Sequence, residues 1–253
     1  MIVIGLDIGS VAAKGVMLDN YAQHQIVIPT GWSPRDAGEQ LIYKLLNASG
    51  YGRSDIDSIV VTGYGRIAME QANKAITEIK CHARGIAELF PEVRTIIDIG
   101  GQDSKVISIN GKGKVVDFAM NDKCAAGTGR FLQVMATAMG IDISEMGSSE
   151  DGSQLVNVNS MCTVFAESEI IGLLARGVPK GGIIAGLHQS VGKRVAAMAR
   201  RVGVKDEIAF TGGVAINAGV RRALAEELGC SVIVPDACQF TGALGAALLA
   251  RVS

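Results

Sequence analysis

The sequence predicts an α/β fold built from two duplicated halves. A short motif occurs twice, as DIGSVAAK (Asp7 to Lys14) and as DIGGQDSK (Asp98 to Lys105), and each copy lies between two β-rich runs. Segments with helical apolar spacing alternate with strands over the rest of the chain, as in α/β proteins. Glycine, with 32 of 253 residues, exceeds its usual share of about 7%, which is typical of backbone that approaches other backbone or a phosphate.

Composition excludes several classes of protein. The formal net charge is −1, so there is no cationic excess to neutralise a nucleic acid or an anionic membrane surface. The start, MIVIGLD, has no basic segment of the kind that begins a secretory signal, and no long apolar run follows. Five widely spaced cysteines without a CxxC pair fit reduced thiols or metal ligands. We therefore expect a cytoplasmic protein with neither nucleic acid nor membrane as a partner.

The first half begins with a predicted hairpin that carries Asp7 at its glycine-bearing turn. Residues 37–50 have helical apolar spacing, and residues 58–65 (SIVVTGYG) are typical of a strand followed by a turn. Helical pieces are expected from residue 68 up to Pro91. We place a domain boundary there, so that residues 1–91 form the N-terminal lobe.

The second half begins with the second hairpin and Asp98. Helices are expected over 129–139, 164–177, 182–203 and 217–228, and strands over 207–213 and 231–235. We assign residues 92–240 to a C-terminal lobe that also carries the nucleotide motif. The last helix, within residues 241–253, has a face of small residues that favours close packing on the first lobe.

The repeated hairpins have the chemistry of a phosphate-binding site. Gly9 and Gly100 allow backbone N–H groups to approach a phosphate, Lys14 adds positive charge, and Asp7 and Asp98 can hold Mg²⁺ through its water ligands. A third glycine element, residues 210–217 (FTGGVAIN), follows a strand and precedes a helix, where a nucleotide base or ribose can lie. Together these elements resemble the actin-like ATPase fold of actin, sugar kinases and heat-shock chaperones, in which two duplicated lobes surround a nucleotide cleft.

A closer resemblance rests on GLDIGSVAAKG, VTGYGR, IDIGGQDSKVI, MNDKCAAGTGRFL, CTVFAESE, FTGGVA and TGALGAALLA. These segments resemble the activators (component A) of 2-hydroxyacyl-CoA dehydratases, within the benzoyl-CoA reductase/BadF-type ATPase group, over essentially the whole chain. The resemblance implies a homodimer that shares one [4Fe–4S] cluster between Cys124 and Cys162 of both subunits, with ATP or ADP and Mg²⁺ bound. The chain departs from the pattern at Val11, where Thr is common, and at Cys238, where a small residue is usual.

The resemblance also implies an activity and its residues. The protein would donate single electrons to a cluster-containing dehydratase or reductase, with a flavodoxin or ferredoxin as its own donor. Asp7, Asp98 and Gln102 are the expected catalytic residues. The expected nucleotide-binding residues are Gly9, Ser10, Ala12, Ala13, Lys14, Gly100, Gly101, Gln102, Gly127, Thr128, Gly129, Gly212, Gly213 and Gln239.

Physical reasoning supports Cys124 and Cys162 as cluster ligands, but spacing alone does not select them among the five cysteines. A cubane cluster needs four thiolates, and two cysteines per subunit complete the set across a twofold axis. Each of the two precedes a helical run, whose free N–H groups can stabilise an anionic cluster. A lone cytosolic cysteine is more often a small buried hydrophobe, which is our interpretation of Cys81, Cys230 and Cys238.

Two alternative functions remain open at this stage. A small-molecule kinase of the same fold would bind ATP without a cluster and would need a carboxylate at the acceptor hydroxyl, for which Asp103 is the nearby candidate. A non-redox ATP-dependent regulatory protein explains neither cysteine segment. The three histidines, His24, His82 and His188, have no metal-ligand spacing and are interpreted as structural.

Overall fold

A computed structural model describes residues 1–149, 152–159, 162–205 and 207–252. The chain forms two compact units. The first consists of Met1–Ile96, Ile107–Asp117 and Asp236–Ser253, and the second of Ile97–Val106 and Phe118–Pro235. The division expected from the sequence, at residues 91 and 240, stays a prediction. In the part of the chain that the model describes, no helix is long and apolar enough to cross a membrane.

The first unit is built on a mixed sheet of five strands in the order β3-β2-β1-β4-β5. Its strands are β1 (Val3–Ile8), β2 (Ala12–Leu18), β3 (Gln23–Pro29), β4 (Ser58–Thr62) and β5 (Lys74–Ala75). β1 pairs antiparallel with β2 and parallel with β4. Every residue of β1 is buried, as expected for a central strand that is covered on both faces.

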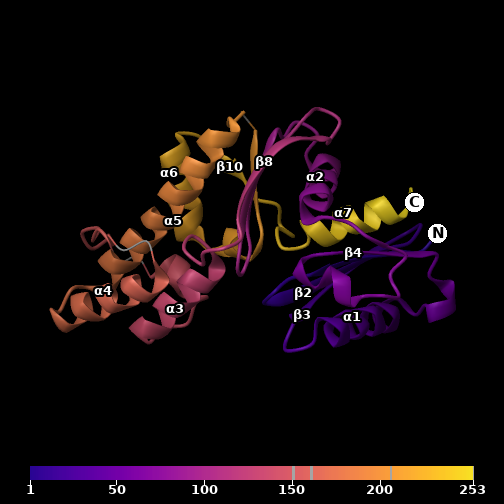
Figure 1. The fold of residues 1–253 in the computed structure, drawn as a ribbon, viewed down its shortest axis with the longest axis horizontal. Coiled ribbons are helices and arrows are strands. Elements are labelled where there is room, and N and C mark those ends of the chain that lie inside the picture. Colours follow the sequence, from indigo (N-terminus) through magenta and orange to yellow (C-terminus); the bar gives the residue numbers. More distant parts are fainter. Residues whose placement is uncertain (150–151, 160–161, 206, 253) are drawn as a thin grey trace. The chain divides into compact units, whose positions relative to one another are not determined.

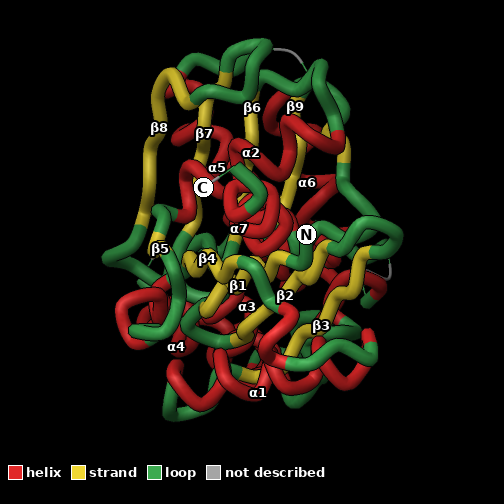
Figure 2. Tube along the Cα trace, turned by 90° about the vertical axis from the view of Figure 1, so that its right-hand side faces the viewer, coloured by secondary structure: helices red, strands yellow, loops and turns green. Residues whose placement is uncertain are grey.

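Helices cover both faces of this sheet. α1 (Pro34–Ser49) begins at Ser33, whose side chain accepts a hydrogen bond from Asp36 N, and packs Leu41, Ile42 and Leu45 against the core. α7 (Thr241–Ala250) lies against β1, β2 and β4 and contacts α2 (Glu78–Leu89) (Figures 1 and 2).

Glycines permit the close approach of α7. A methyl group at Gly5 would overlap the carbonyl oxygen of Ala243, and one at Gly245 would overlap the carbonyl oxygen of Cys81. The small residues of α7 therefore bring its backbone into direct contact with β1 on one side and with α2 on the other.

A second five-stranded sheet has the order β10-β9-β6-β7-β8. Its strands are β6 (Thr95–Ile99), β7 (Ser104–Ile109), β8 (Val115–Asn121), β9 (Ile208–Thr211) and β10 (Val232–Ile233). The second unit also holds α3 (Gly129–Met139), α4 (Thr163–Ala175), α5 (Lys180–Val202) and α6 (Ala218–Leu228). α5 packs along α6, and α3 packs against α4 (Figure 1). Short 3₁₀ turns lie at Arg53–Asp55, Tyr64–Ala68, Met146–Ser148 and Gly213–Ile216.

The α/β class is confirmed, and helices form in each of the expected segments of the second half. The edge strands β3 and β8 were not predicted. β5 interrupts the region from residue 68 that was expected to be helical, and only two residues of SVIVP form β10. Edge strands are partly exposed, so their residues lack the regular apolar pattern of a buried strand.

Candidate functional site

The first hairpin places Asp7 inside strand β1 and not in the turn, which corrects the expected position. Asp7 lies directly opposite Lys14 of β2, and Lys14 Nζ is 3.1 Å from Asp7 Oδ2. The spacing of seven residues in the motif is therefore the spacing that makes the two residues cross-strand partners. The carboxylate is almost fully buried and is matched there by one positive charge.

The turn that follows is held by Thr30. Its hydroxyl donates to Gly9 O at 2.7 Å, and its N–H donates to Val11 O at 3.0 Å. A methyl group at Gly9 would lie 2.8 Å from Ala12 O, so the turn has no room for a side chain. Of the other residues predicted here, Ser10 and Ala12 are half-buried and Ala13 is buried in the sheet. Ala13 therefore offers a ligand only its backbone.

The second hairpin repeats this arrangement with a more buried lysine. Asp98 lies in β6, and Lys105 Nζ is 3.3 Å from Asp98 Oδ2 and 2.7 Å from Asp103 Oδ2. The Thr211 hydroxyl donates to Asp98 Oδ1 at 2.9 Å. Gly100 N donates to Asp103 O, which closes the turn that exposes Gln102.

The duplication extends to a Thr-Gly pair after a neighbouring strand in each half. Gly63 follows β4 and Gly212 follows β9, with φ of 91° and 89°, values that favour glycine. A methyl group at Gly63 would lie 2.7 Å from Asp7 Oδ1, and one at Gly212 would lie 2.9 Å from Asp98 Oδ1. Each carboxylate is thus bordered by a glycine. The shared TG in VTGYGR and FTGGVA is the sequence signal for this second repeat, and Lys105 was already visible as the matching residue of Lys14.

The turn before α3 is attached to the second hairpin. Gly129 N donates to Gly100 O at 2.9 Å, and Arg130 N donates to Gly101 O at 2.8 Å. The buried Thr128 hydroxyl donates to Ala125 O at 2.6 Å and is used within the loop. Gly127 has a φ of 78°. These two backbone hydrogen bonds join the turn to the second hairpin, and both segments carry residues predicted to contact the nucleotide.

The remaining predicted nucleotide residues lie outside these hairpins. Gly213 is exposed, and a methyl group there would meet no atom within 4 Å, so its lack of a side chain leaves open space beside the turn after β9. Gln239 is half-buried just before α7.

Cys124 and Cys162 both belong to the second unit. Cys124 is half-buried in the loop between β8 and α3, where Asn121 Nδ2 donates to its carbonyl oxygen at 2.8 Å. Cys162 is exposed at the N-terminus of α4. Within the described residues, no group of three or more His, Cys, Asp or Glu side chains can hold a metal ion. A cubane cluster needs four thiolates, so Cys124 and Cys162 of one chain can supply half of its ligands.

The other cysteines differ from this pair. Cys81 and Cys238 are buried, and Cys230 is half-buried. Burial raises the pKa of Cys81 to about 12, and the nearby Asp7 carboxylate adds to the rise. Cys81 is therefore a neutral thiol at physiological pH, unlike a metal-bound thiolate.

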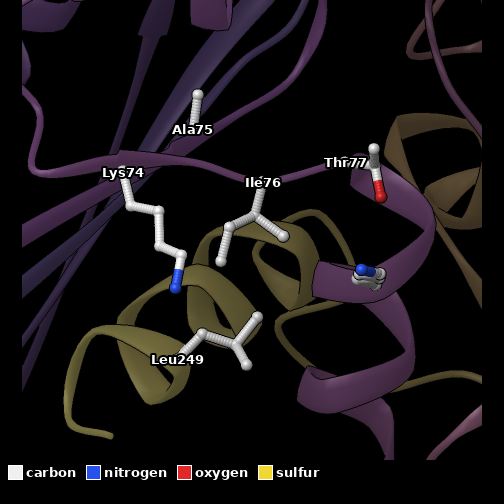
Figure 3. Close-up of a pocket in the computed structure, with 6 residues that line it drawn as sticks. Lys74, Ala75, Ile76, Thr77 and Leu249 are labelled. Atoms are coloured by element: carbon white, nitrogen blue, oxygen red, sulfur yellow. The ribbon is translucent and has the colours of Figure 1, made fainter. Parts of the chain in front are cut away.

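A cavity of about 360 Å³ lies in the first unit between β5, the start of α2 and the end of α7. It is lined by Lys74, Ala75, Ile76, Thr77, Lys80 and Leu249. Figure 3 shows the Lys74 side chain extending toward Leu249. None of the residues predicted for nucleotide or cluster binding lines this cavity.

The chain matches the model of the BadF/BadG/BcrA/BcrD ATPase family over residues 4–250. It is 49% identical to the 2-hydroxyisocaproyl-CoA dehydratase activator of Clostridioides difficile, over 99% of this chain and 95% of the relative. It is 44% identical to the (R)-2-hydroxyglutaryl-CoA dehydratase activating ATPase of Acidaminococcus fermentans, over 98% of this chain and 96% of the relative. The solved structure of the activator of the 2-hydroxyisocaproyl-CoA dehydratase from Clostridium difficile with bound ADPNP superimposes with a TM-score of 0.92, at 49% identity over 99% of this chain and 94% of that chain.

Proposed function

Because the chain belongs to the BadF/BadG/BcrA/BcrD ATPase family, we propose that it is an ATP-dependent iron–sulfur activator. In this function it injects single low-potential electrons into a partner enzyme, either a 2-hydroxyacyl-CoA dehydratase or a double-cubane-cluster reductase. The predicted family, the actin-like ATPase fold and the assignment as an ATPase are confirmed. The iron–sulfur cluster, the electron transfer and the named partners are the proposal.

The nucleotide is proposed to bind as Mg²⁺–ATP at the two hairpins. Asp7 and Asp98 organise the water ligands of the metal, and the N–H groups of the glycine turns contact phosphate oxygens. Gln102, which is exposed in the second turn, orients the attacking water. The other proposed binding residues are Ser10, Ala12, Ala13 and Lys14 of the first hairpin, and Gly127, Thr128, Gly129, Gly212, Gly213 and Gln239 of other segments. The solved relative with bound ADPNP supports a nucleotide in this fold.

Cys124 and Cys162 are proposed to hold one [4Fe–4S] cluster together with the same residues of a second copy. When bound, the cluster supplies one-electron redox chemistry. Cys162 fits this role because it is exposed at a helix N-terminus, where N–H groups and the helix dipole stabilise negative charge. Val164, Phe165 and Ile171 of α4 are each more than half exposed, and this exposed apolar surface supports a homodimer in which a second copy would cover it.

The position of Asp103 does not favour the kinase alternative. Its carboxylate is 2.7 Å from the buried Lys105 ammonium group, so the candidate carboxylate for activation of an acceptor hydroxyl is already paired within the hairpin. The regulatory alternative leaves the exposed Cys162 without a role.

For the proposed activator, a flavodoxin or ferredoxin is the electron donor, and the cytoplasm is the location.

The observation that carries the proposal is the attachment of the Cys124 segment to the second hairpin. From Cys124 the chain runs directly into Gly129 and Arg130, whose N–H groups bind Gly100 and Gly101. Movement of the hairpin with nucleotide state would therefore reach the cysteine loop through backbone hydrogen bonds.

Purification under anoxic conditions followed by iron and sulfide analysis tests the proposal. We expect a brown dimer with about four irons per two chains, whereas a colourless, iron-free protein with ATPase activity would contradict it.

A further inference from the structure

We propose that His82 is a positioning residue for the Asp7 carboxylate and ties it to the start of α7. This inference rests on the proposed function, because it takes Asp7 as an organiser of Mg²⁺. His82 lies in the first turns of α2 and is almost fully buried. The sequence suggested a structural role for His82, and the inference adds a role toward the Asp7 carboxylate.

Hydrogen bonding fixes one edge of the His82 ring. His82 Nδ1 is 3.0 Å from Thr241 Oγ1, and Thr241, the first residue of α7, is also buried. The crossing of α2 and α7 is tight, because a methyl group at Gly85 would overlap the carbonyl oxygen of Thr241. The ring therefore lies where the backbones of α2 and α7 pack in direct contact.

The other edge of the ring faces the same space as Asp7. A methyl group placed at Gly242 would lie 3.1 Å from His82 Nε2 and 3.2 Å from Asp7 Oδ2. The two atoms thus border the same space, and the side chain of any residue other than glycine at position 242 would occupy it. Gly242 also lies in the first turn of α7, whose positive end favours an adjacent carboxylate.

Three groups therefore border the space at Asp7 Oδ2. Lys14 Nζ lies 3.1 Å away, His82 Nε2 borders the same space, and α7 closes it at Gly242. Because Asp7 is almost fully buried, neighbouring polar groups and not bulk water set the orientation of its carboxylate. Residues that orient a metal-binding group contribute about 10- to 100-fold to metal affinity or activity.

In the second hairpin, different contacts orient the carboxylate. Asp98 is held by the Thr211 hydroxyl at Oδ1 and by Lys105 at Oδ2. His82 and Thr241 thus mark a difference between the duplicated halves. Two helices line the space beside the first carboxylate, whereas the second carboxylate contacts side chains from strands of its own sheet.

The test compares the Mg²⁺ concentration for half-maximal ATP hydrolysis in His82→Ala, His82→Asn and Thr241→Val with that of the unchanged protein. His24→Ala is the matched control, because His24 lies on the edge strand β3. We expect His82→Ala to raise the half-saturating Mg²⁺ concentration about 10-fold or more and Thr241→Val to raise it less. His82→Asn, whose amide can replace the bond of Nδ1 to Thr241, should recover part of the loss. The iron–sulfur absorbance should be the same in all variants.

Asp7→Asn separates the two hypotheses. Severe loss of hydrolysis in Asp7→Asn, together with a Mg²⁺ dependence of His82→Ala equal to that of His24→Ala, would overturn the positioning role alone. Unchanged hydrolysis in Asp7→Asn would overturn the proposed role of Asp7 and the inference with it. If His82→Ala does not fold, Thr241→Val decides, since an unshifted Mg²⁺ dependence there also overturns the inference.

Discussion

The Lys105 ammonium nitrogen lies 3.3 Å from Asp98 Oδ2, and both side chains are almost completely buried. The same nitrogen is 2.7 Å from Asp103 Oδ2. One buried cation thus compensates two carboxylates of a single hairpin. Removal of one partner from a buried ion pair leaves an uncompensated charge, which is more costly than the pair itself is stabilising.

Lys105→Met should therefore destabilise the protein by about 3–5 kcal/mol. The measurement is urea-induced unfolding followed by circular dichroism. Lys14→Met is the matched control, since Lys14 makes the equivalent pair with Asp7 but is more exposed, and a smaller loss is expected there. Equal losses in the two variants would contradict the role of burial.

Asp98→Asn should lower ATP hydrolysis about 100-fold or more, because the amide cannot replace a charged oxygen in organising Mg²⁺ at the phosphates. Phosphate release is measured at saturating Mg²⁺, and iron content is expected to stay unchanged. Asp236→Asn, at an exposed position, is the control. Full turnover in Asp98→Asn would show that the metal is held elsewhere.

Cys124→Ala and Cys162→Ala should each abolish the broad visible absorbance of an iron–sulfur cluster. A cubane shared by two chains loses two of its four thiolates in either variant. Cys230→Ala is the control and should retain the absorbance and the iron. The assignment fails if both single variants keep their full iron content.

Gly245→Ala should destabilise the first unit by about 1–3 kcal/mol, because the added methyl group overlaps the Cys81 carbonyl at the crossing of α2 and α7. Gly172→Ala in α4 is the matched control. Its methyl group would meet only Arg176 Nη1 at 3.7 Å, and alanine favours a helix over glycine by roughly 0.5–1 kcal/mol. Thermal unfolding should therefore shift in opposite directions for the two variants.

Nucleotide binding and cluster reduction should be coupled in both directions. If the nucleotide changes the midpoint potential of the cluster, then the redox state of the cluster changes nucleotide affinity by the same factor. Redox titrations compare the ADP form with the form held by a non-hydrolysable ATP analogue, and we expect different midpoints. Identical midpoints, together with reduction of the partner enzyme without ATP, would rule out the proposed mechanism even for a protein that carries the cluster.

The local features of this chain are readable from its sequence. The α/β class, the helices of the second half and the paired hairpins follow from apolar spacing and from glycine-bearing turns, which act over a few residues. The spacing of seven residues between Asp7 and Lys14 already contains the cross-strand pair, since a short turn allows one register. Recognition of the family depends on the same short motifs and is confirmed over residues 4–250.

Tertiary structure decides which of these groups meet. His82 and Thr241 are 159 residues apart, and no periodic pattern relates α2 to α7. Asp7 and Asp98 lie within their strands and not in the turns because the strands continue through Ile8 and Ile99. The sequence by itself determined the α/β class, the helices of the second half and the repeated Asp–Lys hairpins, whereas the burial of Lys105 and the close approach of a glycine to each carboxylate came only from packing. The physical reason is that local patterns specify how a segment folds, while long-range contacts depend on how separate segments fill space together.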